Sequence, residues 1–210
     1  MPATDKTVAR MRGRPRAFDR AAALEKATRL FWTKGYGATS IADLTEAMGI
    51  GSPSLYAAFG SKEALYAEAV EHYASSNSHF VWGNFCSAGT AREAVLALLM
   101  DSAAALTGSV VDMPRGCMLT LSAVGSEGHA ELGELVRSGR HVAYERLKAR
   151  IEQAVAVGEL AASVDGAALA RFIQTVQYGM SILARDGVPQ EELEAVAQVA
   201  MAGWDARTRG

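Results

Sequence analysis

The sequence predicts an all-α fold. Hydrophobic residues make up 50% of the 210 residues and recur at helical spacing through most of the chain, so a buried core is expected. The 20 glycines cluster at apparent helix ends, and there are only 5 prolines. No segment alternates apolar and polar residues convincingly enough to predict a strand, and no internal repeat is visible. Helices are therefore favoured over a strand-rich fold, in which β-branched residues would be denser.

Three helices are expected before residue 62, over residues 19–35, 39–49 and 52–59. A candidate N-cap opens each helix and a glycine ends it. The caps are Asp19, Thr39 or Ser40, and Ser52, and the glycines are Gly35, Gly49 and Gly60. Pro53 stands in the first turn of the third helix, where its missing N–H costs no hydrogen bond. A short helix, a glycine turn and another short helix have the spacing of a helix–turn–helix motif.

Longer helices are expected after Ser61. One runs from this cap through Tyr73, and the mixed polar and aromatic residues that follow predict a frayed helix end and a loop up to Gly89. Thr90 and Glu93 form a capping box that opens the next helix. The remaining expectations are a loop over 108–116, a short buried helix over 117–125, and helices over about 129–157, after Asp165 and after Pro189.

Composition excludes several classes of protein. The longest purely apolar runs, such as residues 94–100, fall far short of the roughly 18 residues that a membrane span needs. The basic N-terminal residues are not followed by an apolar segment, so no secretory signal is expected. Two cysteines, Cys86 and Cys117, make no disulfide framework, which favours the reducing cytoplasm. Without a glycine-rich phosphate loop or a nucleophile motif the chain is not expected to be an enzyme, and no cofactor is expected.

Charge is distributed unevenly along the chain. Residues 1–62 hold ten Lys and Arg against five Asp and Glu, whereas residues 63–210 hold eleven against eighteen. The overall net charge of −2 hides this difference. A basic first third suggests an N-terminal module that faces a polyanion. The alternative is a chance excess of cations on a solvated face.

The start of the third helix points to a particular chemistry. A helix that enters the major groove N-terminus first places small polar side chains and free N–H groups against phosphates and base edges, and residues 52–54 are Ser-Pro-Ser. Tyr56 adds a phenol and Lys62 a cation, while Leu55 and Phe59 would pack on the first two helices. The alternative is that the serines are ordinary N-caps and Tyr56 is half-buried.

Residues 14–73 carry a run of motifs that resembles a known domain. The motifs are FWTKGY (31–36), TSIA (39–42), GI (49–50), SLY (54–56), Phe59 and SKEAL (61–65). In this order they resemble the DNA-binding domain of the TetR/AcrR family of bacterial transcriptional regulators. The resemblance implies a homodimer that binds a palindromic operator in double-stranded DNA and responds to a small-molecule effector. It also implies a helix–turn–helix domain (17–62) and a helical ligand-binding and dimerisation domain (63–210). Residues 1–16 show no apolar periodicity and are expected to form a flexible basic arm.

The same resemblance gives roles to individual positions. Ser40 or Thr39 at the start of the second helix corresponds to a phosphate contact, and so do Tyr56 and Lys62. The base-facing end of the recognition helix corresponds to Ser52, Pro53 and Ser54. In the arm, Arg14 and Arg16 would lie in a minor groove, the alternative being a disordered solubilising tail.

The remainder of the chain is expected to form the dimer and the effector site. The last two helices carry wide apolar stripes that would pair with a second copy in a four-helix bundle, the alternative being that they close a monomer core. Methionines, aromatics and a few polar groups suit an apolar pocket, although each is also a normal core residue. The candidates are Phe85, Met100, Met113, Met118, Leu121, Tyr144, Gln174, Tyr178 and Met180.

Other kinds of sensor remain as alternatives. His72, His79 and Cys86 are seven residues apart, and seven helical residues rise roughly 10.5 Å, too far for neighbours to share one metal ion. A copper or zinc site would need further ligands such as Cys117, His129 or His141. Cys117 is expected to be buried and therefore inert as a redox trigger. We therefore predict a ligand-responsive regulator. The resemblance to this family favours a repressor over an activator. The remaining alternative is a helical ligand-binding protein without DNA affinity.

Overall fold

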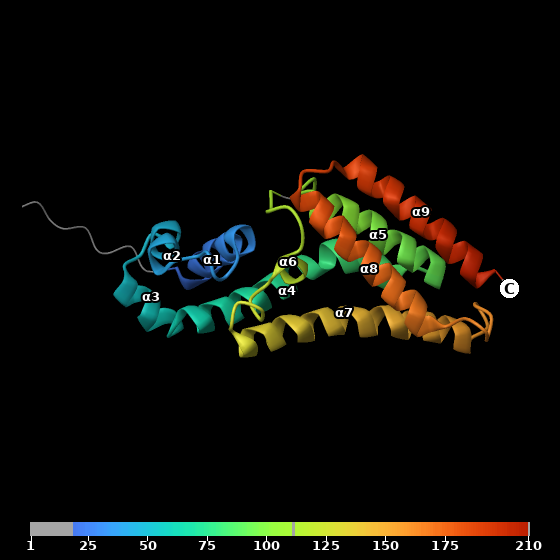
Figure 1. The fold of residues 1–210 in the computed structure, drawn as a ribbon, viewed down its shortest axis with the longest axis horizontal. Coiled ribbons are helices and arrows are strands. Elements are labelled where there is room, and N and C mark those ends of the chain that lie inside the picture. The colour runs from blue at the N-terminus through green and yellow to red at the C-terminus, as the bar shows by residue number, and fades with distance from the viewer. Residues whose placement is uncertain (1–18, 111, 210) are drawn as a thin grey trace, which may run out of the picture.

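The computed structural model describes residues 19–110 and 112–209, and within these residues it is all helical. The order is α1 (Arg20–Lys34), α2 (Ile41–Met48), α3 (Ser52–Phe59), α4 (Lys62–Ser87), α5 (Ala91–Leu106), α6 (Met118–Leu121), α7 (Ala130–Ala156), α8 (Gly166–Arg185) and α9 (Gln190–Thr208). The predicted fold class is confirmed. Figure 1 shows α1 to α3 at one end of an elongated molecule, with α4 leading from them into the remaining helices. None of the helices in the described part of the chain combines the length and the hydropathy that a membrane span requires.

The small end has a hydrophobic core of its own. Phe31 of α1, Leu44 of α2 and Leu55 of α3 are at most 2% exposed and belong to one cluster, which continues into α4 through Leu65 and Tyr66. The rings of Phe31 and Tyr66 meet edge to face at 5.1 Å. The same cluster includes buried residues of α6, of the segment after it and of α7: Met118, Val124, Leu132 and Val136. The three N-terminal helices therefore pack directly on the larger part of the molecule, formed by the far end of α4 and by α5 to α9, which we call the body.

A second core fills the body. It joins the far end of α4 to α5, α7, α8 and α9, and Trp204 of α9 is fully buried in it. Figure 1 shows α5, α8 and α9 gathered above α7. The capping box at Thr90 is present, with Glu93 closing it, and Asp165 caps α8 as expected. The body therefore follows the helix order that the sequence predicts.

The prediction of a frayed end for α4 is wrong. The helix continues without a break to Ser87, because its last turns pack on the second core. Phe85 is 3% exposed, and Val81 and Trp82 lie partly buried against the same cluster. Intrinsic helix propensity is a weak preference that tertiary packing overrides.

Two other helix starts and ends differ from expectation. Gly51, not Ser52, is the N-cap of α3, because the backbone N–H groups of Ser54 and Leu55 donate to the Gly51 carbonyl. Ser52 is therefore the first helical residue. The expected short helix over 117–125 shrinks to a single turn in α6, and only Met118 in that turn is buried.

The loop before α6 joins the two cores. The Trp32 indole N–H donates to the carbonyl of Gly116 at 3.0 Å, and the backbone N–H of Cys117 donates to Ser181 Oγ at 2.8 Å. Arg185 at the end of α8 donates to the carbonyls of Trp32, at 2.9 Å, and of Arg115, at 2.8 Å. We call these contacts the junction. They tie α1, the loop and α8 together at one place.

Gly116 is a position where only glycine fits without strain. Its φ is +78°, and a Cβ there would lie 2.8 Å from the carbonyl oxygen of Ser181. Gly35 has a similar φ of +81° but open space around the added atom. A side chain at residue 35 would therefore introduce backbone strain alone, whereas one at residue 116 would introduce both strain and a steric clash.

We expect Gly116→Ala to destabilise the protein more than Gly35→Ala. Backbone strain costs each variant about 1–3 kcal/mol, and overpacking adds about 1–3 kcal/mol at residue 116 alone. Urea unfolding at one fixed protein concentration measures the difference. Equal losses would contradict the close packing of the junction.

Candidate functional site

Helix α3 presents one buried face and one exposed face. Leu55 and Phe59 are 0% and 4% exposed, whereas Tyr56 is 47% exposed. Pro53 and Ser54 at the start of the helix are also exposed, and Ser52 is half-buried. The left-handed conformation of Gly49 (φ +72°) ends α2 and lets the chain turn into α3. The small polar residues predicted to contact DNA are thus at the surface.

Arg20 of α1 holds the far end of α3 in place. Its guanidinium lies 4.4 Å from the centroid of the Phe59 ring and donates to the Ala58 carbonyl at 3.3 Å. It also donates to both carboxylate oxygens of Glu68 on α4 at 2.7 Å. One side chain thereby fixes the direction of α3 relative to α1 and α4.

The start of α2 distinguishes Ser40 from Thr39. Thr39 is 1% exposed, and its hydroxyl donates to the carbonyl of Gly35 at 2.6 Å. Ser40 is exposed and forms a capping box with Asp43, whose pKa is held well below its usual range by the Lys34 ammonium at 2.8 Å and by the Ser40 hydrogen bonds. Of the two candidates, Ser40 is the one whose side chain faces solvent.

Lys62 at the start of α4 lies against the small core. Its ammonium is 4.1 Å from the centroid of the Tyr36 ring, and partial burial lowers the pKa of Lys62. The Tyr36 hydroxyl donates to Glu63 at 2.7 Å, and burial together with this carboxylate raises the pKa of Tyr36. Arg14 and Arg16, the predicted arm contacts, lie outside the described residues.

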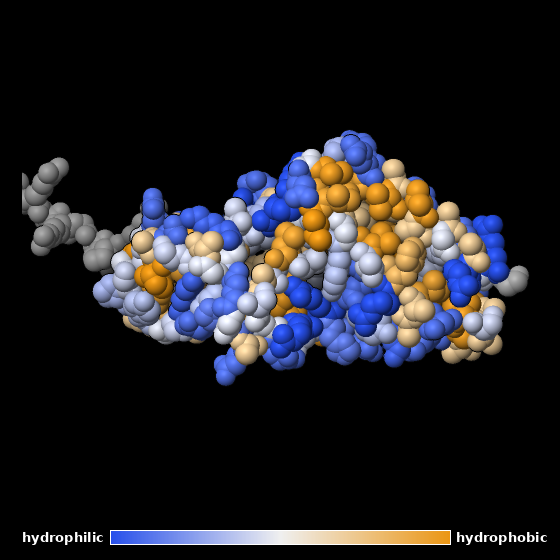
Figure 2. All heavy atoms as spheres, in the orientation of Figure 1, coloured by the Kyte–Doolittle hydropathy of each residue, from blue (hydrophilic) through white to orange (hydrophobic). Residues whose placement is uncertain are grey.

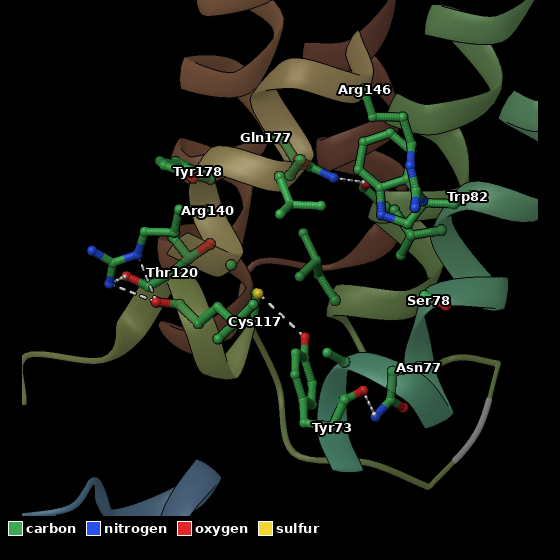
Figure 3. Close-up of a pocket in the computed structure, with 18 residues that line it drawn as sticks. Tyr73, Asn77, Ser78, Trp82, Cys117, Thr120, Arg140, Arg146, Gln177 and Tyr178 are labelled. Carbon is green, nitrogen blue, oxygen red and sulfur yellow. Dashed lines mark hydrogen bonds between the residues drawn. The ribbon is translucent and has the colours of Figure 1, made fainter. Parts of the chain in front are cut away.

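A cavity of about 270 Å³ opens between α4, α7 and α8, next to the junction. Figure 3 shows Tyr73 and Cys117 at one end, Trp82 and Arg146 on one side, and Gln177 opposite the Tyr73 end. The lining residues are Tyr73, Ala74, Asn77, Ser78, Val81, Trp82, Ser102, Leu106, Cys117, Leu119, Thr120, Gly139, Arg140, Val142, Ala143, Arg146, Gln177 and Tyr178. This volume is slightly below the range of about 300–1,000 Å³ for pockets that hold drug-sized ligands, so the cavity suits a small molecule.

Of the nine sequence-predicted ligand residues, Tyr178 lines this cavity and the other eight do not. Four of the eight are buried core residues: Phe85, Met118, Gln174 and Met180. Met100 and Tyr144 pack against the second core, Met113 packs against the first, and Leu121 lies against Gly116. The methionines and aromatics mostly fill the cores, in keeping with their shape and hydrophobicity.

The cavity residues that the sequence analysis missed come mainly from two helix faces. Tyr73, Asn77 and Val81 recur every four residues on α4, and Gly139, Ala143 and Arg146 share a face of α7. The polar residues that argued for a frayed α4 are thus partly the lining of the cavity. The four-residue spacing of the polar residues Tyr73 and Asn77 on a continuous α4 was the signal that could have located the cavity.

Polar groups at the two ends of the cavity are already paired. The Tyr73 hydroxyl donates to Cys117 Sγ at 3.2 Å, and burial raises the pKa of Tyr73 well above its usual value. Gln177 Nε2 donates to Ser102 Oγ at 2.8 Å. Cys117, expected to be buried, is half-buried and lines the cavity.

Among the described residues, no group of three or more His, Cys, Asp or Glu side chains is placed to hold a metal ion. His72, His79 and Cys86 all lie on α4.

Comparison with known proteins identifies the family. Residues 23–69 match the family model described as bacterial regulatory proteins, tetR family. The HTH-type transcriptional repressor ComR of Escherichia coli (strain K12) is 37% identical, over 96% of this chain and 97% of that protein. The chain belongs to the TetR family. It is therefore a ligand-responsive, DNA-binding transcriptional regulator and not an enzyme.

Two further relatives extend the similarity along the whole fold. The uncharacterized HTH-type transcriptional regulator YezE of Bacillus subtilis (strain 168) is 27% identical, over 92% of this chain and all of that protein. A solved structure of a cysteine mutant of the TetR family transcriptional regulator CifR, complexed with 26-base-pair double-strand operator DNA, is 41% identical. It covers 91% of this chain and all of its own, with a TM-score of 0.85.

The two neighbouring hydroxyls at the start of α2 allow a matched test. Thr39→Val removes a buried hydrogen bond and Ser40→Ala removes an N-cap, so each is expected to cost about 1 kcal/mol of stability. We expect only Ser40→Ala to weaken DNA binding, because only that side chain is at the surface. Fluorescence anisotropy with a labelled duplex, at a temperature where both variants are folded, measures this. Equal loss of DNA affinity in both variants would contradict the assignment.

Proposed function

We propose that this protein is a cytoplasmic repressor that binds its operator as a homodimer and is released from it by a small molecule. The observation that carries the proposal is the exposed face of α3, where Ser54 and Tyr56 point outward while Leu55 and Phe59 anchor the helix. Repression is supported by the ComR relative, which is named a transcriptional repressor. Operator binding is supported by the CifR complex with its operator DNA.

In the proposed complex the N-terminus of α3 enters the major groove. Ser52, Pro53 and Ser54 face base edges, whereas Ser40, Tyr56 and Lys62 contact phosphates and fix the register. Residues 1–16 form the basic arm, with Arg14 and Arg16 in the neighbouring minor groove. We place the helix–turn–helix domain at 17–62 and the ligand-binding and dimerisation domain at 63–210, although the small core also takes residues from α4, α6 and α7.

The dimer forms through α8 and α9. These helices expose large apolar side chains that a monomer would leave in water, and Figure 2 shows them as a hydrophobic area over both helices. The exposed residues are Phe172, Ile182, Leu183, Val196 and Val199. Two copies packed through this face make a four-helix bundle with two-fold symmetry. The same symmetry places two copies of α3 in successive major grooves, about 34 Å apart.

The effector cavity is in direct contact with the DNA-binding end. Tyr73 lines the cavity and its ring meets the Trp32 ring of α1 at 4.7 Å, edge to face. Cys117 also lines the cavity, and its neighbour Gly116 accepts the Trp32 hydrogen bond. A ligand that prefers a different arrangement of these walls shifts α1 and α4, and with them the spacing of the two α3 helices. Because coupling is reciprocal, the effector must bind the DNA-bound protein more weakly than the free protein.

Selection from genomic DNA tests the proposed function and identifies the operator. Genomic fragments are incubated with the purified protein, recovered with it and sequenced. A shared palindrome among the bound fragments is the expected result. Retention of no duplex, even at low salt, would contradict the proposed function and favour a helical ligand-binding protein without DNA affinity.

We expect Tyr56→Ala to lower the affinity for operator and for random duplex by the same factor, because a phosphate contact carries no sequence information. Tyr56→Phe keeps the ring and removes only the hydroxyl, so it should lower both affinities by a smaller factor than Tyr56→Ala does. Anisotropy titrations with both duplexes provide the measurement. A loss confined to the operator would show that Tyr56 contacts bases.

For the arm, we expect the double variant Arg14→Ala, Arg16→Ala to bind operator more weakly and with a flatter salt dependence. The slope of log affinity against log salt should fall by up to about two, one for each phosphate contact removed. The double variant Arg137→Ala, Lys148→Ala removes two charges from α7 and is the matched control, whose slope should not change. An unchanged slope in the arm variant would exclude these arginines from the interface.

A further inference from the structure

The charges around the effector cavity are of one sign. Its eighteen lining residues include two arginines, Arg140 and Arg146, and no aspartate or glutamate. A cationic ligand would therefore meet repulsion without a counter-charge in the wall, and an anionic one would meet attraction.

The two arginines have different environments. The guanidinium of Arg140 donates to the carbonyls of Leu119, Thr120 and Ser122, at 2.5, 3.2 and 2.8 Å, and Figure 3 shows it directed away from the middle of the cavity. Arg140 thus holds the α6 segment against α7. Its role is structural.

Arg146 is placed to meet a ligand. It is exposed, and its guanidinium lies 4.8 Å from the centroid of the Trp82 ring. Figure 3 shows Arg146 and Trp82 together on one side of the cavity. Among the described residues no carboxylate lies within 4.0 Å of it, whereas Arg137, Arg92 and Arg150 each pair with one. Stacking on Trp82 fixes the plane of the guanidinium and leaves its edge able to donate to an anion.

The rest of the wall is largely apolar. Val81, Trp82, Leu106, Leu119 and Val142 line it, and the polar groups of Tyr73 and Gln177 already have protein partners. A ligand in this cavity would gain mostly from burying an apolar body, with one charged contact at Arg146.

We propose that the effector is a small amphipathic organic anion, whose carboxylate binds Arg146 and whose apolar body lies between Trp82 and Leu119. This inference rests on the proposed function, in which the cavity is the effector site. A planar carboxylate matches the guanidinium edge with two parallel hydrogen bonds, which a neutral group cannot reproduce. A cavity of about 270 Å³ favours a small ligand at this position.

Calorimetry with matched probes tests the charge preference. The probes are phenylalkanoates of increasing chain length, each paired with its primary amide, which has nearly the same shape and no charge. We expect at least one carboxylate to bind about tenfold more tightly than its amide. In Arg146→Gln the two affinities should become equal.

A charge control accompanies the variant. Arg137→Gln removes the same charge from the same helix, at a position that pairs with Glu134 and does not line the cavity. Its preference for the carboxylate should match that of the unaltered protein. Circular dichroism of both variants establishes that each is folded.

The outcomes separate this inference from the proposed function. Binding of no probe, equal affinity for carboxylate and amide, or a preference that survives Arg146→Gln would each overturn the inference. DNA binding is measured on the same preparations without any probe. A protein that binds duplex but shows no carboxylate preference keeps the proposed function and loses the inference. A protein that prefers the carboxylate but binds no duplex loses the proposed function, and the cavity would then be an anion site but not an effector site.

Discussion

The hydrogen bond from the Trp32 indole to the Gly116 carbonyl is the contact on which the arrangement depends. It is buried and joins α1 of the DNA-binding end to the loop that forms one end of the cavity. Arg185 adds the end of α8 to the same place. A donor and an acceptor buried together cannot separate without losing a hydrogen bond, so the two ends of the molecule constrain one another. Ligand binding and DNA binding can therefore be coupled over a short path.

Burial and charge decide which parts of the chain form cores and which form binding surfaces. The small end gives its apolar residues to a compact core and leaves Ser54 and Tyr56 of α3 at the surface. The body uses its apolar residues twice, in the second core and on the exposed faces of α8 and α9. Between these parts lies a cavity whose wall carries positive charge alone. Each of the three surfaces thus matches one partner: DNA, a second copy and a small anion.

Much of the fold could be predicted from the sequence, because capping residues and glycines mark helix ends locally. Asp19, Ser40, Ser61, Thr90 and Asp165 all cap the helices expected of them. The exposed face of α3 was also predictable. The length of α4 was not, because burial of Phe85 in the second core, which several helices build, decides it. The cavity was missed for a related reason: it lies where facing helices leave space, and hydrophobic residues such as Met118 and Met180 fill the cores instead.

Hydrogen–deuterium exchange of the whole chain, with and without duplex, tests most directly whether the N-terminus of α3 contacts DNA and whether DNA binding changes the structure around the cavity. Contact between α3 and DNA predicts slower exchange at residues 52–56, where the duplex covers the backbone, and a change at residues 116–121, which the Trp32 contact links to α1. Protection on another face of the molecule, with residues 52–56 unchanged in the presence of bound DNA, would contradict it.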